Sequence, residues 1–212
     1  MNSYIYIKKY GRERSRQMNK LDGLYELKKL NIPTVNWKKF TDATKLDDHH
    51  LWTIRTAVYE GNDLDLPKLF GADAQTAEKF ARRISKEIGN NGIVIYYPYL
   101  IAQKSGNLQI SGNSIVIEAI KGDLVPLLRG NAIDVTYIYS KTGQKIVGDE
   151  DFLSEKEIND LLFYAGYLTQ LYGYMLAEKR CLQLEFSFAS ECGLKKEAIG
   201  APELIFFEIR TV

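Results

Sequence analysis

The 212-residue chain has little cysteine and little histidine. It contains two cysteines, Cys181 and Cys192, and two histidines, which are adjacent at His49 and His50. Two cysteines cannot frame a disulfide-stapled fold of this size, and the cysteines and histidines lack the spacing of a zinc site. We therefore expect a cytoplasmic protein in a reducing environment, without a metal site built from thiols or imidazoles.

The chain also lacks an excess of charge of one sign and any long apolar run. Its 28 lysines and arginines balance 27 aspartates and glutamates, which argues against sequence-independent binding of nucleic acid. No apolar run approaches the ~20 residues of a membrane-spanning helix, and the first residues do not resemble a signal peptide. The length is enough for a buried core. We expect neither a membrane nor a nucleic acid as partner.

Hydrophobic periodicity predicts strands and helices in mixed order. The expected strands cover residues 4–7, 50–58, 93–100, 114–120, 132–140, 145–147, 181–189 and 203–211, and the expected helices cover residues 12–30, 75–88 and 155–179. Ser154 and Glu157 have the spacing of a capping box at the start of the last helix. Residues 63–74 are expected to be a loop, and residues 105–107 a turn. Because strands and helices do not alternate strictly, the pattern predicts an α+β fold of two lobes.

The last two expected strands alternate strongly between apolar and polar residues. Glu185 lies on the polar face of the first, and Glu208 and Arg210 lie opposite Ile205, Phe207 and Ile209 on the second. If the strands pair antiparallel, the two carboxylates would lie about 5 Å apart at Cβ and repel each other unless a cation or a proton lies between them. Magnesium would meet this need, with Arg210 neutralising a phosphate. The alternative is a purely structural Glu–Arg ladder on a solvated sheet.

Four short segments of the chain, in order, add a resemblance to these patterns. They are residues 19–33, 52–57, 115–130 and 182–212. They look like a Gly-Lys-Gly-x-x-Leu-x-x-Leu helix leading into Gly-Ile-Pro, a Val-Arg-Ser-Ser-Ala strand, an Ile-Glu-Ala-x-x-Gly-x-Gly-Glu run, and an Asp-Ile-Glu-Trp-Ala strand before a strand ending Gln-x-Arg-Pro. This set resembles the ATP-binding domain of the phosphoenolpyruvate synthase and pyruvate phosphate dikinase family. The resemblance implies one ATP-grasp-like unit over residues 1–212, with approximate lobes at 1–91 and 92–212 and the nucleotide cleft between them.

The resemblance also implies roles for single residues. Lys20, Arg55 and Arg210 would contact the phosphates of ATP, and Glu118 would lie near its adenosine end. Arg55 and Arg210 would be the catalytic residues, because phosphoryl transfer depends mostly on positioning and charge neutralisation. The acceptor would be an unidentified small molecule or a side chain of a partner protein.

The implied metal is Mg²⁺, with Glu185 and Glu208 as its ligands. Gln183 stands where the family has a metal-strand aspartate, and Glu208 stands where it has a glutamine, so two carboxylates remain. Asn19 and Leu21 replace the glycines on either side of the family's lysine. The chain has no counterpart of the family's phosphohistidine domain or barrel, so complete dikinase chemistry is not expected within it.

Three alternatives stay open at this point. Eroded phosphate contacts would leave a nucleotide-binding or regulatory module without catalysis. Residues 20–23 (Lys-Leu-Asp-Gly) also fit the Lys-x-Asp-Gly signature of DNA and RNA ligases, in which the lysine carries AMP, although the ligases' later Glu-Gly strand is missing. The basic residues between 8 and 16, with tyrosines nearby, would suit either nucleic-acid stacking or a lip over a triphosphate.

Overall fold

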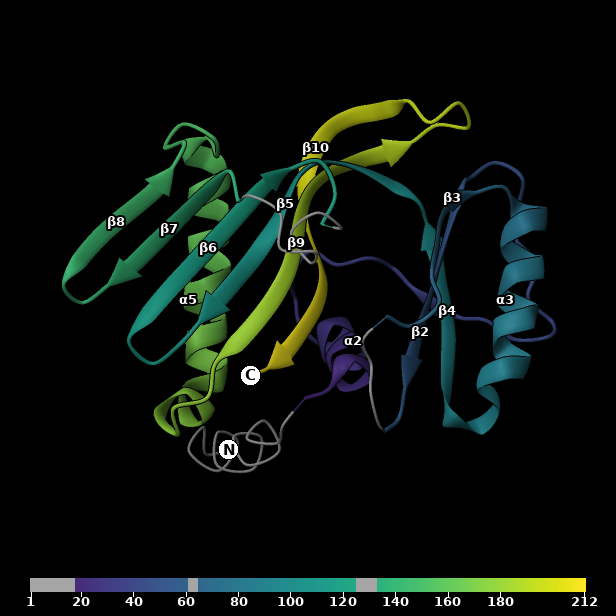
Figure 1. Ribbon diagram of the computed structural model, residues 1–212, viewed down its shortest axis with the longest axis horizontal. Coiled ribbons are helices and arrows are strands. Elements are labelled where there is room, and N and C mark those ends of the chain that lie inside the picture. Colours follow the sequence, from purple (N-terminus) through teal and green to yellow (C-terminus); the bar gives the residue numbers. More distant parts are fainter. Residues whose placement is uncertain (1–17, 61–64, 125–132) are drawn as a thin grey trace, which may run out of the picture.

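The computed structural model of the chain describes residues 18–60, 65–124 and 133–212, which form two antiparallel sheets and three α-helices (Figure 1). The α+β prediction is confirmed. The predicted strand at residues 4–7, the first part of the helix predicted over 12–30 and the basic residues 8–16 lie outside the described residues.

The smaller sheet has four strands in the order β1 (Lys38–Lys39), β4 (Gly92–Pro98), β2 (Trp52–Val58) and β3 (Leu69–Ala72). Helix α3 (Ala74–Ile88), which the short 3-10 helix η1 (Gly89–Asn91) follows, packs on one face through Ala77, Ala81 and Ile84. Asp73 caps α3 by accepting a hydrogen bond from the Thr76 backbone N–H. On the opposite face, Figure 1 shows helix α2 (Lys20–Lys29) between the two sheets. Arg55 points to this inner face, because its neighbour Ile54 is buried under α3.

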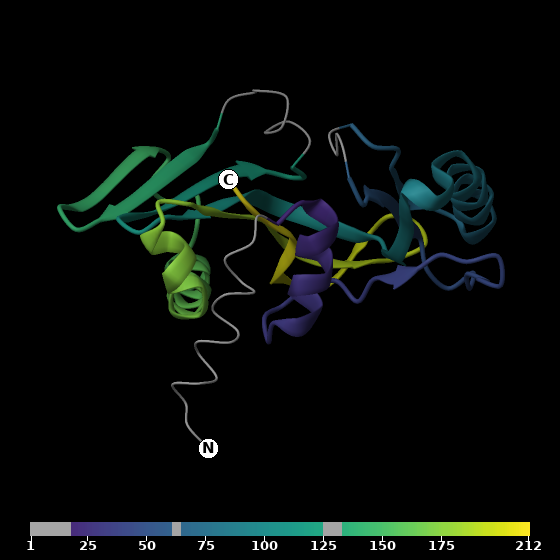
Figure 2. The same cartoon turned by 90° about the horizontal axis from the view of Figure 1, so that it is seen from below.

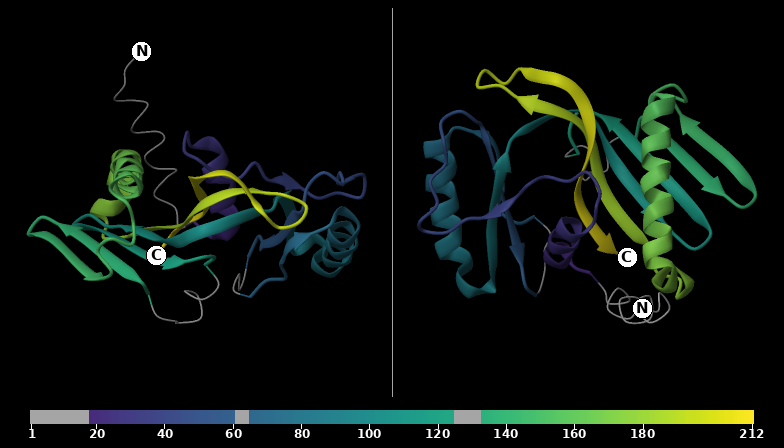
Figure 3. Two further views of the ribbon diagram at one scale, coloured as in Figure 1. Left: turned by 90° about the horizontal axis from the view of Figure 1, so that it is seen from above. Right: turned by 180° about the vertical axis from the view of Figure 1, so that it is seen from behind.

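The larger sheet has six strands in the order β10 (Ala198–Thr211), β9 (Leu182–Cys192), β5 (Leu100–Ile110), β6 (Ser114–Lys121), β7 (Val135–Ser140) and β8 (Gly143–Gly148). Helix α5 (Glu155–Ala177) crosses one face of this sheet, as Figures 2 and 3 show. Its Leu161, Ala165 and Leu168 are fully buried against Leu184 and Phe186 of β9. The opposite face of the sheet carries the polar residues of β9, and it is the face that bears the site described below.

The capping box predicted at the start of α5 is confirmed, and it connects the helix to the sheet. Glu157 accepts hydrogen bonds from the backbone of Ser154 and from Lys104 Nζ of β5 at 2.7 Å. Burial opposes ionisation of Glu157, but the hydrogen bonds from Lys104 and Ser154 outweigh it and hold its pKa below the usual value. The charged form of Glu157 therefore stabilises the folded state above the ordinary glutamate pKa, and this contribution is lost as pH falls through the lowered pKa.

We expect Glu157→Gln to lower the free energy of unfolding by about 1 kcal/mol at pH 7, because glutamine keeps the cap but loses the ion pair with Lys104. The loss should disappear at a pH low enough to protonate Glu157 in the folded protein. Urea unfolding at the two pH values measures both effects. Glu155→Gln, in the same exposed first turn, is the control; an equal pH dependence in the two variants would contradict the assignment.

Two segments expected to be loop or turn are strands instead. Residues 69–72 form β3, which pairs with β2 at the edge of the smaller sheet, so the loop predicted over 63–74 is wrong there. Residues 105–107 lie in the middle of β5. Gly106 is required in that strand because a Cβ there would lie 2.0 Å from the Glu118 carbonyl oxygen and 2.6 Å from Phe186 Cζ. The glycine allows a close approach between strands, so the prediction of a turn at residues 105–107 is wrong.

A β-bulge changes the predicted face pattern of β10. Phe206 pairs with Phe186, but Glu208 pairs with Glu185, so Phe207 is the extra residue. As a result Phe206 and Ile209 are buried in the core under α5, whereas Ile205 and Phe207 pack toward the smaller sheet. The prediction that Ile205, Phe207 and Ile209 share one face is therefore wrong. The antiparallel pairing that places Glu208 opposite Glu185 is present.

The two sheets divide the chain a little later than the approximate lobe boundary at residues 91 and 92. Strand β4 follows that boundary, yet it pairs with β2 inside the smaller sheet. The connection between the sheets is Tyr99, between Pro98 and Leu100. None of the described helices is long and apolar enough to cross a membrane.

Candidate functional site

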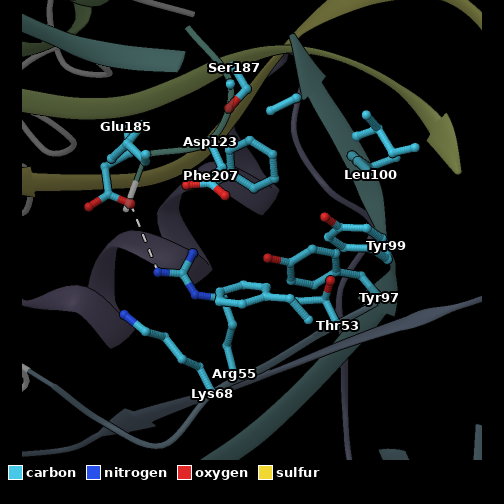
Figure 4. Close-up of a pocket in the computed structure, with 15 residues that line it drawn as sticks. Thr53, Arg55, Lys68, Tyr97, Tyr99, Leu100, Asp123, Glu185, Ser187 and Phe207 are labelled. Carbon is cyan, nitrogen blue, oxygen red and sulfur yellow. Dashed lines mark ion pairs between the residues drawn. The ribbon is translucent and has the colours of Figure 1, made fainter. Parts of the chain in front are cut away.

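Five charged side chains from four elements meet where the two sheets face each other. Lys20 Nζ lies 3.4 Å and Arg55 Nη2 lies 3.2 Å from Oε2 of Glu208. Arg210 Nη2 contacts the other oxygen of the same carboxylate, Oε1. Arg55 Nη2 also lies 3.9 Å from Glu185 Oε2, as the dashed line in Figure 4 marks. We call these five residues the ion cluster. The structure thus brings together five of the six residues singled out from the sequence.

The ion cluster is poorly hydrated and carries more positive than negative charge. The Glu208 side chain is 1% exposed, and those of Lys20 and Arg55 are 14% and 13% exposed. Burial opposes the charge of Glu208 most strongly, but the neighbouring cations hold its pKa below the usual value. Burial and the nearby Glu208 raise the pKa of Glu185. The cluster gathers three cations in a low-dielectric cleft, and such a convergence of positive groups favours an anionic ligand.

Local structure explains how Lys20 and Glu208 reach this place. Asn19 caps α2 by accepting a hydrogen bond from the Asp22 backbone N–H, so Lys20 is the first helical residue and extends from the end of the helix. Gly23 lets α2 lie directly on β10, since a Cβ at this position would be 1.7 Å from the Ile209 carbonyl oxygen. The bulge at Phe207 turns Glu208 to the same face as Glu185.

A cavity of about 330 Å³ adjoins the ion cluster and shares Arg55 and Glu185 with it (Figure 4). Its walls come from both sheets and from Tyr99, the connection between them. Its aromatic lining residues are Phe70, Tyr97, Tyr99 and Phe207, and its charged ones are Arg55, Lys68, Asp123 and Glu185. The rings of Tyr97 and Phe207 lie 6.4 Å apart between centroids. A flat apolar group attached to an anion would fit this combination.

Glu118 lies apart from the ion cluster. Asn107 of β5 stands directly opposite both Glu185 and Glu118, so Glu118 is two strands away on the same sheet face. Two strand spacings correspond to about 10 Å. Within the described part of the chain, the cavity lining does not include Glu118.

Several cavity residues were missed from the sequence. Lys68 lies in the segment expected to be a loop, and Asp123 follows β6 in the polar stretch after it. The alternation of β9 indicated that Ser187 and Glu185 share a face. Only the folded structure, which brings Arg55 of the smaller sheet to the same cavity, marks that face as a candidate site. Tyr97 lies one strand from Arg55 on the same inner face, a relation that the pairing of β2 with β4 creates.

The donors at the site suit an oxygen-binding cation. The described residues include no group of three or more histidine, cysteine, aspartate and glutamate side chains arranged to hold a metal. Two carboxylates do stand directly opposite each other, Glu185 and Glu208, and Asn107 follows Glu185 on the next strand. The Asn107 side-chain oxygen is buried and has no hydrogen-bond partner among the described residues. Carboxylate and amide oxygens are the ligands that Mg²⁺ accepts, so the residues fit that ion.

Comparison with known proteins identifies the fold. No protein-family model and no curated protein matches the chain. Among solved structures, D-alanyl-alanine synthetase A from Vibrio cholerae aligns with a TM-score of 0.51 at 12% identity, over 92% of this chain and 55% of that chain. An acetyl-coenzyme A synthetase from Ca. Korarchaeum cryptofilum aligns with a TM-score of 0.47 at 10% identity, over 100% and 99% of the two chains. The D-alanine-D-alanine ligase from Coxiella burnetii aligns at 0.41 and 12%, over 87% and 44%.

The chain therefore spans about half the length of the Vibrio synthetase. At this identity the likeness concerns the fold alone. The chain has an α+β, ATP-grasp-like fold.

Proposed function

We propose that this protein binds Mg-ATP between its two sheets and transfers a phosphoryl group from it to an unidentified acceptor. The observation that carries the proposal is the buried carboxylate of Glu208, held by Lys20, Arg55 and Arg210 beside an aromatic cavity. Lysine and arginine side chains brought together beside a cavity are the groups that bind phosphate oxygens. A triphosphate would present several negatively charged oxygens to these three cations.

The cavity and the ion cluster would divide the nucleotide between them. The base and ribose would occupy the aromatic cavity beside Tyr97, Tyr99 and Phe207. The phosphates would extend past Arg55, which belongs to both the cavity and the ion cluster, toward Lys20 and Arg210. Glu118 remains a candidate contact for the adenosine end, because it lies on the same sheet face.

The ion pairs of Glu208 explain how nucleotide and metal binding would depend on each other. In the absence of an anion, both oxygens of Glu208 are engaged by cations. When phosphates draw Lys20, Arg55 and Arg210 away, the Glu208 carboxylate becomes free to act with Glu185 as a metal ligand. Bound Mg²⁺ would supply further neutralisation of phosphate charge. We therefore propose that the metal binds with the nucleotide and weakly without it.

The chain's own contribution to the reaction would be positioning and electrostatics. Arg55 and Arg210 would stabilise the charge that develops on the transferred group while its bond to the ADP leaving group breaks and a bond to the acceptor oxygen or nitrogen forms. We propose that the chain is similar to the phosphoenolpyruvate synthase family in this use of ATP. The acceptor, a small molecule or a side chain of a partner protein, would have to reach the phosphate end of the nucleotide beside Lys20 and Arg210.

A nucleotide titration tests the proposal. We expect Arg55→Met to weaken ATP binding in the presence of Mg²⁺ at least tenfold, because it removes a largely buried cation that contacts both cavity and cluster. Calorimetry on the purified chain measures the change. Arg83→Met is the matched control, since Arg83 pairs with Glu87 on the exposed surface of α3. Equal affinities in the two variants, or no ATP binding by the unchanged protein, would refute the proposal.

Experiments on the same purified protein distinguish the two alternative functions, a regulatory nucleotide-binding module and a covalent nucleotidyltransferase. ATP binding without turnover, alone and with candidate acceptors, would favour a regulatory nucleotide-binding module. Radiolabel from ATP that survives denaturation on Lys20 would favour covalent nucleotidyl transfer as in the ligases. Lys20 is the first residue of a helix here, and burial together with Arg55 lowers the pKa of its ammonium group.

A further inference from the structure

Asn107 is the one described residue with a buried side-chain nitrogen or oxygen that lacks a hydrogen-bond partner. Its Oδ1 atom is the unpaired one. The residue stands in the middle of β5, at the centre of the larger sheet, where buried polar atoms are normally paired. An unpaired buried oxygen in such a place indicates a partner from outside the chain, such as an ion, a water molecule or a ligand.

The strand register places this oxygen next to the ion cluster. Glu208, Glu185 and Asn107 are directly opposite one another on β10, β9 and β5, so their side chains leave the sheet on the same face. Directly opposite residues have Cβ atoms about 5 Å apart, which is close enough for neighbouring side chains to share one cation. Ser105, two residues before Asn107, hydrogen-bonds Ser187 of the cavity wall at 2.7 Å. The face that carries Asn107 is therefore the face of the cavity.

Glu185 lies between Glu208 of β10 and Asn107 of β5, and these two neighbours differ in their ion pairs. On one side, both oxygens of Glu208 are already engaged by Lys20, Arg55 and Arg210. On the other side, Asn107 offers an oxygen with no partner. Glu185 itself lies 3.9 Å from Arg55, beyond hydrogen-bond distance. The oxygens with remaining capacity are thus those of Glu185 and Asn107.

We propose that Asn107 is a metal ligand, and that the divalent cation accompanying the nucleotide binds between Glu185 and the Asn107 side-chain oxygen. This inference rests on the proposed function and extends it from the two sequence-derived carboxylates to a third strand. Glu208 then serves first to hold the three cations and joins the metal when phosphates replace it. A carboxylate and a neutral amide oxygen would leave the other positions of the ion's octahedron to phosphate and water.

A change of metal preference tests the ligand role directly. The thiolate of Asn107→Cys should make Cd²⁺ compete with Mn²⁺ at least tenfold better than it does in the unchanged protein, because thiolates select softer metals. Electron paramagnetic resonance of Mn²⁺ displaced by Cd²⁺, in the presence of a non-hydrolysable ATP analogue, measures this competition. Gln109→Cys is the matched control, because Gln109 is an exposed amide two residues along the same face of β5. Both variants retain Cys181 and Cys192.

A second substitution keeps the proposal falsifiable if the thiol variant folds poorly. Asn107→Leu should weaken Mn²⁺ binding about tenfold while leaving metal-free binding of the analogue unchanged. An unchanged Cd²⁺ preference in a folded Asn107→Cys, or equal losses of metal and metal-free analogue binding in Asn107→Leu, would overturn the ligand role alone. Failure of the unchanged protein to bind the analogue would instead refute the proposed function and this inference together.

Discussion

Replacing Gly23 by alanine is expected to destabilise the protein by about 2–3 kcal/mol, although Gly23 lies inside a helix. On helix propensity alone, alanine should stabilise that position by about 1 kcal/mol. The structure reverses the sign because a Cβ on Gly23 would lie 1.7 Å from the Ile209 carbonyl oxygen. Helix α2 would have to move off β10, and Lys20 would move with it. Urea unfolding of the variant measures the loss.

Gly166 supplies the control for this prediction. It lies in α5, it is exposed, and a Cβ there would meet nothing within 4 Å. Gly166→Ala is therefore expected to stabilise the protein by about 0.5–1 kcal/mol. Opposite signs for the two alanine variants would support the close docking of α2 on β10. A Gly23→Ala variant as stable as the unchanged protein would show that the helix does not rest on that carbonyl.

Glu208→Gln is expected to lower the free energy of unfolding by about 3 kcal/mol, since removing one partner of a buried charge network leaves the others uncompensated. Three cations converge on Glu208, which is 1% exposed. Glutamine keeps the size of the side chain, so lost charge rather than a cavity would cause the change. Chemical denaturation at pH 7 measures it, with Glu203→Gln as control on the exposed outer part of β10.

The same variant should respond to ATP differently from the unchanged protein. Without magnesium, ATP should raise the melting temperature of Glu208→Gln more than that of the unchanged protein, because phosphates would replace the lost counter-charge. This result would connect the ion cluster with anion binding. If Glu208→Gln were as stable as Glu203→Gln and gained nothing more from ATP, the ion cluster would be neither a stabilising network nor a phosphate site.

Several features of the fold and the site could be predicted from local sequence patterns. The capping box at Ser154 and Glu157 and the regular apolar stripe behind it specify α5, because both depend on residues a few positions apart. The alternation along β9 and β10 placed Glu185 and Glu208 on polar positions of adjacent strands. Such periodicities are physical consequences of backbone geometry. Such patterns can therefore be recognised in the sequence without knowing which segments each face will contact.

Other features depend on contacts between segments distant in sequence. Gly106 looks like a turn residue, yet Glu118 and Phe186 on the two neighbouring strands require the absence of a side chain there. The bulge at Phe207 shifts the register by one residue and moves Ile209 to the opposite face from Phe207. No local pattern marks this shift, because a bulge is decided by how two strands pair.

The order of the amino acids thus determined which segments are helical, which strands have one polar and one apolar face, and which residues bear the charges of the proposed phosphate site. The folded chain added the convergence of Lys20, Arg55 and Glu208 from three separate elements, the aromatic cavity beside them, and the unpaired oxygen of Asn107. The reason is physical: periodicity is a short-range property of the backbone, whereas burial, desolvation and ion pairing arise only when distant segments come within a few ångströms of one another.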